Sequence, residues 1–424
     1  MSDSSPMTLV AIGCGSRART YCKIAVSLTG RYQVVAGADP VQERRDAMRV
    51  ISENENFQSF DSADALLAED RLADVAIIGT QDNYHFEPAK QALEKGYHIL
   101  LEKPAAQSAD EVRELAALAK RHDRKILLCF VLRYTPFYAK VHEIVRSGRL
   151  GEIVSLHASE GVDAWHQSHS FVRGHWGNTI HSTPMIIAKC SHDTDYISWL
   201  IDSKCSSVSS FGRLSQFTEK HAPEGAKDRC TSGCPHSAPN GGSCLYDAHQ
   251  YLDKHERWLD MVYPHPTDRE PEEVIEWLKV SPWGRCAWKC DNDAVDHQVV
   301  NMDFENGVTA SLTMTAFDFG RSLEIYGTKA TLRGGDALKS IAEKEIVLRD
   351  HATGELEVIT LDEAGDDGYR GHGGGDYGLV NAMDGIFRGE GSDSSLIENA
   401  IEGHIIGFAA EQSRLQDGKP VRLS

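Results

Sequence analysis

The sequence predicts an α/β protein whose first third forms a doubly wound parallel sheet. Five apolar runs occur there, helical patterns separate them, and most of the runs do not alternate with polar residues. Strands that alternate with helices are typical of a parallel sheet, and uninterrupted apolar runs suit strands covered on both faces. The runs are Leu9–Ile12, Gln33–Asp39, Asp74–Thr80, Tyr97–Leu101 and Lys125–Leu128.

The length and charge of the chain limit what it can be. Its 424 residues exceed one compact core and indicate two domains, which we place at 1–128 and 129–424. The net charge of −19 argues against nucleic acid or an anionic membrane as partner. No run approaches the roughly 18 apolar residues of a membrane span. The polar start 1–8 lacks a signal-peptide pattern, so we expect a cytoplasmic protein.

A glycine-rich turn follows the first predicted strand. Its sequence, Gly13-Cys14-Gly15-Ser16-Arg17-Ala18, matches the dinucleotide fingerprint G-x-G-x-x-G/A. The first glycine permits the tight turn, the second lets the backbone approach a pyrophosphate, and the alanine lets the following helix pack closely. The helix N-terminus, with Ser16 and Arg17, then faces the phosphates. The turn predicts an adenine dinucleotide cofactor.

Asp39 ends the second predicted strand, about twenty residues after the turn, as the fingerprint requires. Its carboxylate can accept hydrogen bonds from the adenosine ribose. This favours NAD over NADP, because a 2′-phosphate would meet a negative charge. Arg44 and Arg45 follow closely and could hold that phosphate instead, so NADP stays open. A solvated helix face is the simpler interpretation of the two arginines.

Polar residues also follow the next strands, at the carboxyl edge where ligands bind in open α/β sheets. They are Thr80, Asn83, His85, Glu102 and Lys103. We expect all of them to line the cofactor site. Lys103, held before Pro104 in an extended conformation, could hydrogen-bond a substrate hydroxyl, and desolvation and nearby positive charge would lower its pKa. The alternative is a lysine that faces solvent.

Together these motifs resemble the Gfo/Idh/MocA family, named after glucose–fructose oxidoreductase, inositol dehydrogenase and rhizopine catabolism. Glu102-Lys103-Pro104 is the most specific motif, and Arg133-Tyr134-x-Pro136 and Gly148-x-x-Gly151 add to the resemblance. It is clear over about residues 8–200 and looser through 324–328 to the C-terminus. The resemblance implies a Rossmann domain followed by an α/β domain with a large, mostly antiparallel sheet, whose open face covers the nicotinamide and substrate.

The resemblance also implies roles for individual residues. Lys103 matches the lysine that binds and activates the substrate hydroxyl, and His192 matches the histidine that acts as acid and base. An unperturbed histidine pKa near about 6.5 suits that role, although a structural histidine is the alternative. Many members carry an aspartate four residues earlier, where this chain has Ala188. Lys189, Asp193 and Asp195 are the nearby candidates to orient or assist His192. We expect Arg133, Asp193 and Asp195 to bind substrate.

The resemblance favours an NAD(P)-dependent oxidoreductase that moves a hydride to or from a sugar, polyol or inositol-like alcohol. Two alternatives stay open. One is an NAD-dependent glycoside-cleaving enzyme that oxidises the sugar transiently. The other is a non-catalytic NAD(P)-sensing regulator, similar to the yeast galactose repressor. Family members often form homodimers or homotetramers through the second-domain sheet, and we expect the same here.

The second half contains an irregular stretch at about 218–284, which we interpret as an insertion. Cys230, Cys234 and Cys244 lie there, and Cys286 follows. Four such donors can hold a structural zinc ion, with His236 or Cys290 as other sources of the fourth ligand. Free thiols or a disulfide are the alternatives.

The remaining patterns concern the second domain and the C-terminus. Asn306-Gly307 between the apolar runs 299–304 and 308–314 predicts a hairpin in an antiparallel sheet. Farther on, Asp376 is expected to cap a helix that begins near residue 377, while His372 could reach the active site. Helical spacing at 377–388 and 394–415 predicts two helices that pack on a domain face.

Overall fold

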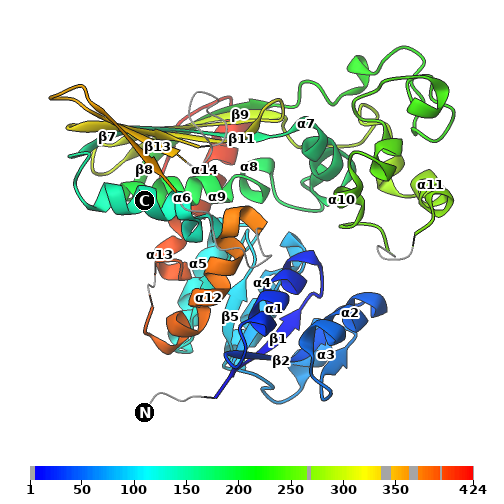
Figure 1. The fold of residues 1–424 in the computed structure, drawn as a ribbon, viewed down its shortest axis with the longest axis horizontal. Coiled ribbons are helices and arrows are strands. Elements are labelled where there is room, and N and C mark those ends of the chain that lie inside the picture. Colours follow the sequence, from blue (N-terminus) through cyan, green and yellow to red (C-terminus); the bar gives the residue numbers. More distant parts are fainter. Residues whose placement is uncertain (1–4, 265–268, 336–344, 362–370, 392–393, 424) are drawn as a thin grey trace.

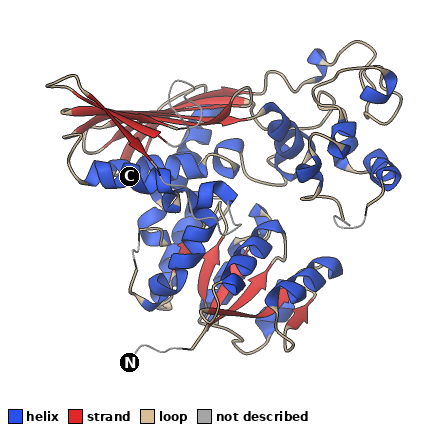
Figure 2. Cartoon of the chain, viewed as in Figure 1, coloured by secondary structure: helices blue, strands red, loops and turns tan. Residues whose placement is uncertain are grey.

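The computed structural model describes residues 5–264, 269–335, 345–361, 371–391 and 394–423. The chain forms two α/β layers, each built on its own sheet (Figure 1). Helices of the second domain lie between the two sheets (Figure 2). Among the described residues, no helix is long and apolar enough to cross a membrane.

The first sheet has six parallel strands in the order β3-β2-β1-β4-β5-β6, which confirms the doubly wound prediction. The strands are β1 Met7–Ile12, β2 Tyr32–Ala38, β3 Gln58–Phe60, β4 Val75–Ile78, β5 His98–Leu101 and β6 Ile126–Leu128. The strand order reverses between β1 and β4, and ligands bind at such a switch point. The short strand β3 was not predicted.

Helices cover both faces of this sheet, which explains the uninterrupted apolar runs. They are α1 Ser16–Ser27, α2 Gln42–Ser52, α3 Ala63–Ala68, α4 Phe86–Glu94 and α5 Ala109–Arg121. Side-chain caps define two of the helix starts, because Ser62 accepts from Ala65 N and Ser108 from Glu111 N. All four residues of β4 are buried.

The second sheet has nine strands in the order β14-β13-β12-β11-β7-β10-β9-β8-β15. They are β7 Ile153–Val162, β8 Cys205–Arg213, β9 His297–Phe304, β10 Thr309–Thr315, β11 Phe319–Gly327, β12 Ala330–Gly334, β13 Glu345–Asp350, β14 Leu356–Thr360 and β15 Val421–Arg422. Only β7 and β10 pair in parallel within the described sheet. The mostly antiparallel sheet is therefore confirmed, and so is the β9–β10 hairpin around Asn306-Gly307.

Helices α6 (Pro136–Arg146), α9 (Ser191–Ile201) and α14 (Glu402–Leu415) pack on one face of the second sheet. Figure 1 shows them between that sheet and the first domain. Burial alternates along β9 and β10, as expected for strands with one covered face. These helices therefore separate the covered face of the second sheet from the first domain (Figure 1).

Helix α12 (Gly375–Arg388) returns to the first domain and packs against α1 (Figure 1). Leu379 and Met383 belong to the apolar cluster that contains Leu9 of β1. The helix begins at Gly375, with Gly374 before it and no side-chain cap. The prediction that Asp376 caps this helix is wrong, because its carboxylate is engaged by Arg17 instead.

The chain between β8 and β9 forms a lobe at one end of the second sheet, drawn in green at the right of Figure 1. Its helices are short: α10 Glu256–Leu259, α11 Pro271–Val280 and the 3-10 turns Glu219–His221, Ala238–Asn240, Ala248–Leu252 and Pro282–Gly284. Other short α-helices after residue 129 are α7 Ala164–His166, α8 Met185–Ala188 and α13 Ile397–Ala400. We call residues 214–296 the side lobe.

Candidate active site

The glycine-rich turn has the geometry of a dinucleotide cradle. Gly13 has φ +81°, and a Cβ there would approach Thr80 N to 2.8 Å, so only glycine fits. Gly15 precedes α1 without any side-chain cap, which leaves the first helical N–H groups for a phosphate. Ala18 lies against Gly79, where a Cβ would come within 3.1 Å of the alanine Cβ. These residues fit an adenine dinucleotide.

Asp39 lies at the end of β2 beside this turn and is buried. Its carboxylate accepts hydrogen bonds from Cys14 N and Val41 N, both at 2.9 Å. Arg44 Nη1 approaches it to 3.8 Å but is half exposed. The carboxylate is therefore fixed by the backbone at the position expected for ribose recognition, with an arginine close by.

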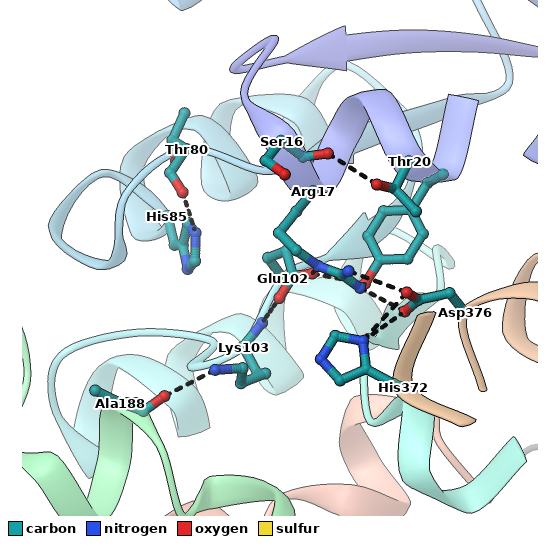
Figure 3. Close-up of polar contacts among 11 residues, drawn as sticks. Ser16, Arg17, Thr20, Thr80, His85, Glu102, Lys103, Ala188, His372 and Asp376 are labelled. Atoms are coloured by element: carbon teal, nitrogen blue, oxygen red, sulfur yellow. Dashed lines mark hydrogen bonds and ion pairs between the residues drawn. The ribbon is translucent and has the colours of Figure 1, made fainter. Parts of the chain in front are cut away.

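Arg17 joins three segments that are far apart in the sequence (Figure 3). Its Nε lies 2.8 Å from Glu102 Oε1, and its Nη2 lies 2.6 Å from Asp376 Oδ1. Tyr21 also donates to Glu102, at 2.6 Å. We expected Arg17 to contact the cofactor, but its guanidinium is used within the protein. It links helix α1, the carboxyl end of β5 and helix α12.

Lys103 follows Glu102 across the edge of the sheet, and its peptide bond to Pro104 is cis. The Lys103 ammonium donates to the carbonyl of Ala188, at 2.7 Å (Figure 3). Burial lowers the pKa of Lys103, and the positive charges of Lys189 and Arg17 add to the effect, while Glu102 opposes it. Lys103 therefore lies where the two domains meet, and it loses its proton more readily than an exposed lysine does.

The charge of Glu102 is stabilised by its surroundings. Burial alone would raise its pKa, but the charges of Arg17 and Lys103 and the hydrogen bond from Tyr21 outweigh it and hold the pKa below its ordinary value. Glu102 Oε2 also accepts from Lys103 N, at 3.0 Å. Glu102 therefore fixes the backbone of the lysine rather than competing for its ammonium.

Two histidines hold the segment around Lys103. The ring of His85 lies between two carbonyl oxygens, 2.6 Å from that of Pro104 and 3.2 Å from that of Thr80. His404, on α14, accepts from Ala105 N at 2.9 Å. The Thr80 hydroxyl donates to the Tyr84 carbonyl. The side chains of Thr80 and His85 are thus engaged within the protein, whereas the buried Asn83 Oδ1 has no hydrogen-bond partner in the part of the chain that the structure describes.

His192 lies in the first turn of α9 and is buried. Its Nδ1 has no hydrogen-bond partner among the described residues. Burial lowers its pKa well below the ordinary value, and the charges of Lys103 and His372 lower it further. The imidazole is therefore neutral near pH 7 and can accept a proton. No carboxylate stands at position 188, since Ala188 offers only its backbone carbonyl.

The three expected substrate residues are paired inside the protein. Arg133 binds Asp195 through two bonds, of 2.8 and 2.6 Å, and both side chains are buried. Asp193 lies 2.8 Å from Arg321. Burial raises the pKa of Asp195 to about 6 against the opposing charge of Arg133. These ion pairs anchor helix α9. We expected the same side chains to contact the substrate directly.

Three charged residues near the site, Asp82, Glu160 and Arg321, were not predicted. Asp82 is buried and accepts from Trp176 Nε1, at 3.0 Å, and from Thr183 Oγ1, at 2.8 Å, so it ties the loop after β4 to the second domain. Glu160 lies 3.1 Å from Lys189 and 2.8 Å from Arg321. Asp82 falls in a stretch that the sequence had singled out, but the other contacts join residues too distant for any local pattern.

His372 does reach the site, as one sequence interpretation held. Its ring centroid lies 6.2 Å from that of His192, and its Nδ1 lies 3.1 Å from Asp376 Oδ2. It stands in a left-handed turn, with φ +50° followed by Gly373 and Gly374 at +63° and +88°. Non-glycine residues in that region cost energy and cluster at functional sites.

The four predicted zinc ligands lie together around one cavity. Even so, no three His, Cys, Asp or Glu side chains in the described ranges are grouped to hold a metal ion, so the zinc prediction has no support in this arrangement. The reason is visible at Cys230, whose thiol turns to Arg173 and the Tyr246 carbonyl, at 3.8 and 3.9 Å. His236, an alternative ligand, is bonded to the Glu224 carbonyl.

Fold and site together define an α/β protein with a parallel sheet of the dinucleotide-binding type and a lysine and a histidine near its carboxyl edge. The model described as "Oxidoreductase family, NAD-binding Rossmann fold" matches residues 7–130. The model of the same family's C-terminal alpha/beta domain matches residues 142–365. The chain belongs to the Gfo/Idh/MocA oxidoreductase family, as its motifs predicted.

Individual relatives are distant. The chain is 25% identical to inositol 2-dehydrogenase of Rubrobacter xylanophilus over 207 residues, 49% of this chain and 55% of that one. It is 25% identical to D-xylose 1-dehydrogenase (NADP(+)) of Hypocrea jecorina over 175 residues, 39% of this chain and 44% of that one. The first matches span between a third and about half of the curated relatives' length.

A solved structure extends the likeness to the whole fold. Scyllo-inositol dehydrogenase from Lactobacillus casei, with bound NAD(H) and scyllo-inositol, superposes with a TM-score of 0.64 and covers 99% of both chains. Only 14% of the residues are identical, so this likeness concerns the fold.

Proposed function

We propose that this chain is an NAD-dependent oxidoreductase that transfers a hydride to or from a sugar, polyol or inositol-like alcohol. The observation that carries the proposal is the position of Lys103. Its ammonium stands at the carboxyl edge of the parallel sheet, between the glycine-rich turn and the helix of His192. The names of two relatives, an inositol 2-dehydrogenase and a D-xylose 1-dehydrogenase, support the substrate class.

The residues divide the work of alcohol oxidation between them. The nicotinamide supplies the hydride acceptor when it is bound. Lys103 donates a hydrogen bond to the substrate oxygen and stabilises the negative charge that develops there. His192, neutral because its pKa is depressed, accepts the hydroxyl proton. Glu102 and the two histidines around residue 104 keep the lysine in place.

The charged groups near Lys103 favour a neutral substrate. To bind a sugar acid, the site would need a basic side chain that no carboxylate of the protein already neutralises. The acidic groups here are at least as many as the basic ones. The basic groups are Arg17, Lys103, Lys189 and Arg321, and the acidic ones are Asp82, Glu102, Glu160, Asp193 and Asp376. A neutral polyol requires only hydrogen bonds, so the charge balance supports a neutral alcohol over an anionic one.

Asp39 supports NAD as the cofactor. Its carboxylate is fixed by two backbone N–H groups and can accept from both ribose hydroxyls, whereas a 2′-phosphate would add negative charge beside it. Arg44 is the residue that would relieve such repulsion, but it lies 3.8 Å away and half exposed. We therefore expect tighter binding of NAD+ than of NADP+.

A substrate panel tests the proposal. Protein stripped of nucleotide is titrated with NAD+ and NADP+ in a calorimeter and then incubated with sugars, polyols and inositols while NAD(P)H absorbance is followed. We expect cofactor binding and turnover of at least one neutral alcohol, and a Lys103→Met variant that still binds cofactor but has a kcat lowered by about 10²–10³. Absence of cofactor uptake would refute the proposal. Cleavage of a glycosidic bond with no net NADH would identify the glycoside-cleaving alternative.

We also propose that the chain self-associates through the uncovered face of the second sheet. Val154 of β7, Phe211 of β8 and Val299 of β9 are exposed there, beside a groove of about 620 Å³. Exposed apolar area on a sheet face favours burial against a second copy. Light scattering should give a dimer or tetramer, and Phe211→Lys should shift it towards monomer. A wild-type monomer at micromolar concentration contradicts this.

A further inference from the structure

A second lysine, Lys189, stands beside the proposed site. It lies in the break between helices α8 and α9, one residue after Ala188 and three residues before His192. The Ala188 carbonyl is the group that accepts from the Lys103 ammonium, at 2.7 Å (Figure 3). The short segment 188–192 therefore holds one lysine through its carbonyl and carries a second lysine together with the histidine.

Lys189 is fixed at both ends. Its backbone N donates to Met185 O, at 2.9 Å, in the last turn of α8. Its ammonium lies 3.1 Å from Oε1 of Glu160, a buried residue of strand β7. Arg321, directly opposite on strand β11, lies 2.8 Å from the other oxygen of Glu160. The sheet thus holds the ammonium in place before any ligand arrives, which lowers the entropy that a lysine loses on binding.

The ion pair leaves the ammonium able to bind more. The Lys189 side chain is 20% exposed, whereas that of Glu160 is 2% exposed, so the carboxylate is covered and the ammonium is open to a ligand. An ammonium carries three N–H donors, and the pair engages one carboxylate oxygen. N–H donors of Lys189 therefore remain for a hydrogen-bond acceptor of the substrate.

The charge of Lys189 acts on three groups around the site. Burial lowers the pKa of His166, on α7, and the charge of Lys189 is the next cause. Burial is also the first cause of the lowered pKa values of Lys103 and His192, and the charge of Lys189 adds to both. Because such interactions weaken with distance, the ammonium lies close to groups from three separate elements.

Unsatisfied polar atoms in the same segment indicate a ligand with hydroxyl groups. Ser191 Oγ and His192 Nδ1 are buried, and neither has a hydrogen-bond partner among the described residues. Buried polar atoms without a partner cost free energy. A hydroxyl group both donates and accepts, so a polyol can satisfy atoms of this kind while it also accepts from an ammonium.

We propose that Lys189 binds the substrate hydroxyl on the carbon next to the one that is oxidised, and that Glu160 is a positioning residue for the Lys189 ammonium. The inference rests on the proposed function. It narrows the substrate class to alcohols with hydroxyl groups on two adjacent carbons. Lys103 contacts the reacting oxygen and Lys189 the neighbouring one. Lys189 makes and breaks no covalent bond, so its hydrogen bond is present before and during the reaction and acts on KM.

Steady-state kinetics of the full-length wild type give the first test. An alcohol that the substrate panel identifies is compared with its analogue in which hydrogen replaces the adjacent hydroxyl. A hydrogen bond from a charged donor is worth about ten- to hundredfold in binding, so KM should rise by that factor for the analogue. Equal KM values would overturn the subsite and leave the oxidoreductase function intact. Absence of turnover across the whole panel would refute the proposed function and the subsite with it.

Variants then assign the effect to Lys189. Lys189→Met should raise KM about ten- to hundredfold for the complete alcohol but less than about threefold for the analogue, with kcat little changed. Lys189→Arg keeps the charge and the donors and should keep the preference for the complete alcohol, while Glu160→Gln should weaken it. Lys140→Met is the matched control, because Lys140 pairs with Glu143 on the surface of α6, and it should change neither constant.

A purely structural role of Lys189 predicts a different result. Lys189→Met would then affect the complete alcohol and the analogue by the same factor, and that outcome would overturn the proposal. If Lys189→Met does not fold, Lys189→Arg and the wild-type comparison still decide. Loss of the preference in Lys189→Arg together with an unchanged preference in Glu160→Gln would also contradict the assignment.

Discussion

Replacing Asp39 by asparagine should convert a preference for NAD into weak discrimination. The carboxylate is buried and held by two backbone N–H groups at 2.9 Å, so its charge stays near any 2′-phosphate. Two unit charges about 5 Å apart interact by about 3 kcal/mol at an effective permittivity of about 20. That energy corresponds to about a hundredfold in Kd. Loss of the charge should therefore tighten NADP+ binding by up to about a hundredfold.

The same substitution should weaken NAD+ binding by about tenfold. Ribose hydroxyls then donate to a neutral oxygen, and the loss of charge assistance costs about 1–1.5 kcal/mol. Calorimetric titration of both cofactors into the wild type and Asp39→Asn measures the two effects. Arg44→Ala is the control and should change NAD+ binding little. If the wild type binds NADP+ at least as tightly, or if the ratio of the two Kd values moves less than threefold, the assignment of Asp39 is wrong.

Three further outcomes follow from the contacts. Lys103→Met should lower kcat by about 10²–10³. Thermal melts should show little loss of stability, since the substitution removes a cation from an enclosed site. A decrease in kcat of less than tenfold would contradict the proposed role of Lys103. Asp82→Ala should destabilise by about 2–3 kcal/mol, because Trp176 loses a charged acceptor; unchanged denaturant curves would contradict this. Burial first, and then basic neighbours, lower the pKa of His98 to about 4 and of His404 to about 3. The unfolded state then binds more protons, so stability is lost as the pH falls below about 6.5, and His404→Gln should flatten that curve.

Features written in short stretches of sequence could be predicted. The parallel sheet follows from apolar runs whose strands are covered on both faces. The cofactor cradle follows from Gly13 and Gly15 between a predicted strand and a predicted helix, with Asp39 about twenty residues farther on. The hairpin at Asn306-Gly307 is equally local. Strand β3 escaped because it has three residues, none of them buried. It pairs with β2 through its backbone, which leaves no hydrophobic pattern to detect.

Features that depend on distant contacts could not be predicted. Asp376 stands before an apolar pattern, as a capping residue does, yet its partner Arg17 lies 359 residues away. Arg133 and Asp195 are 62 residues apart. The sequence places them near the site but cannot say that they neutralise each other. For the same reason, four cysteines in an irregular stretch predicted a cluster, but the turn of the Cys230 thiol towards Arg173 depends on the folded side lobe.

The use of Arg17 shows how the cofactor turn and the lysine are coupled. The backbone of Arg17 belongs to the first turn of α1, where a phosphate would bind. Its side chain forms ion pairs with Glu102 and Asp376. Glu102 in turn fixes Lys103 N. One guanidinium therefore joins helix α1, helix α12 and, through Glu102, the lysine backbone. The same group of charges therefore positions both the cofactor cradle and the proposed catalytic lysine.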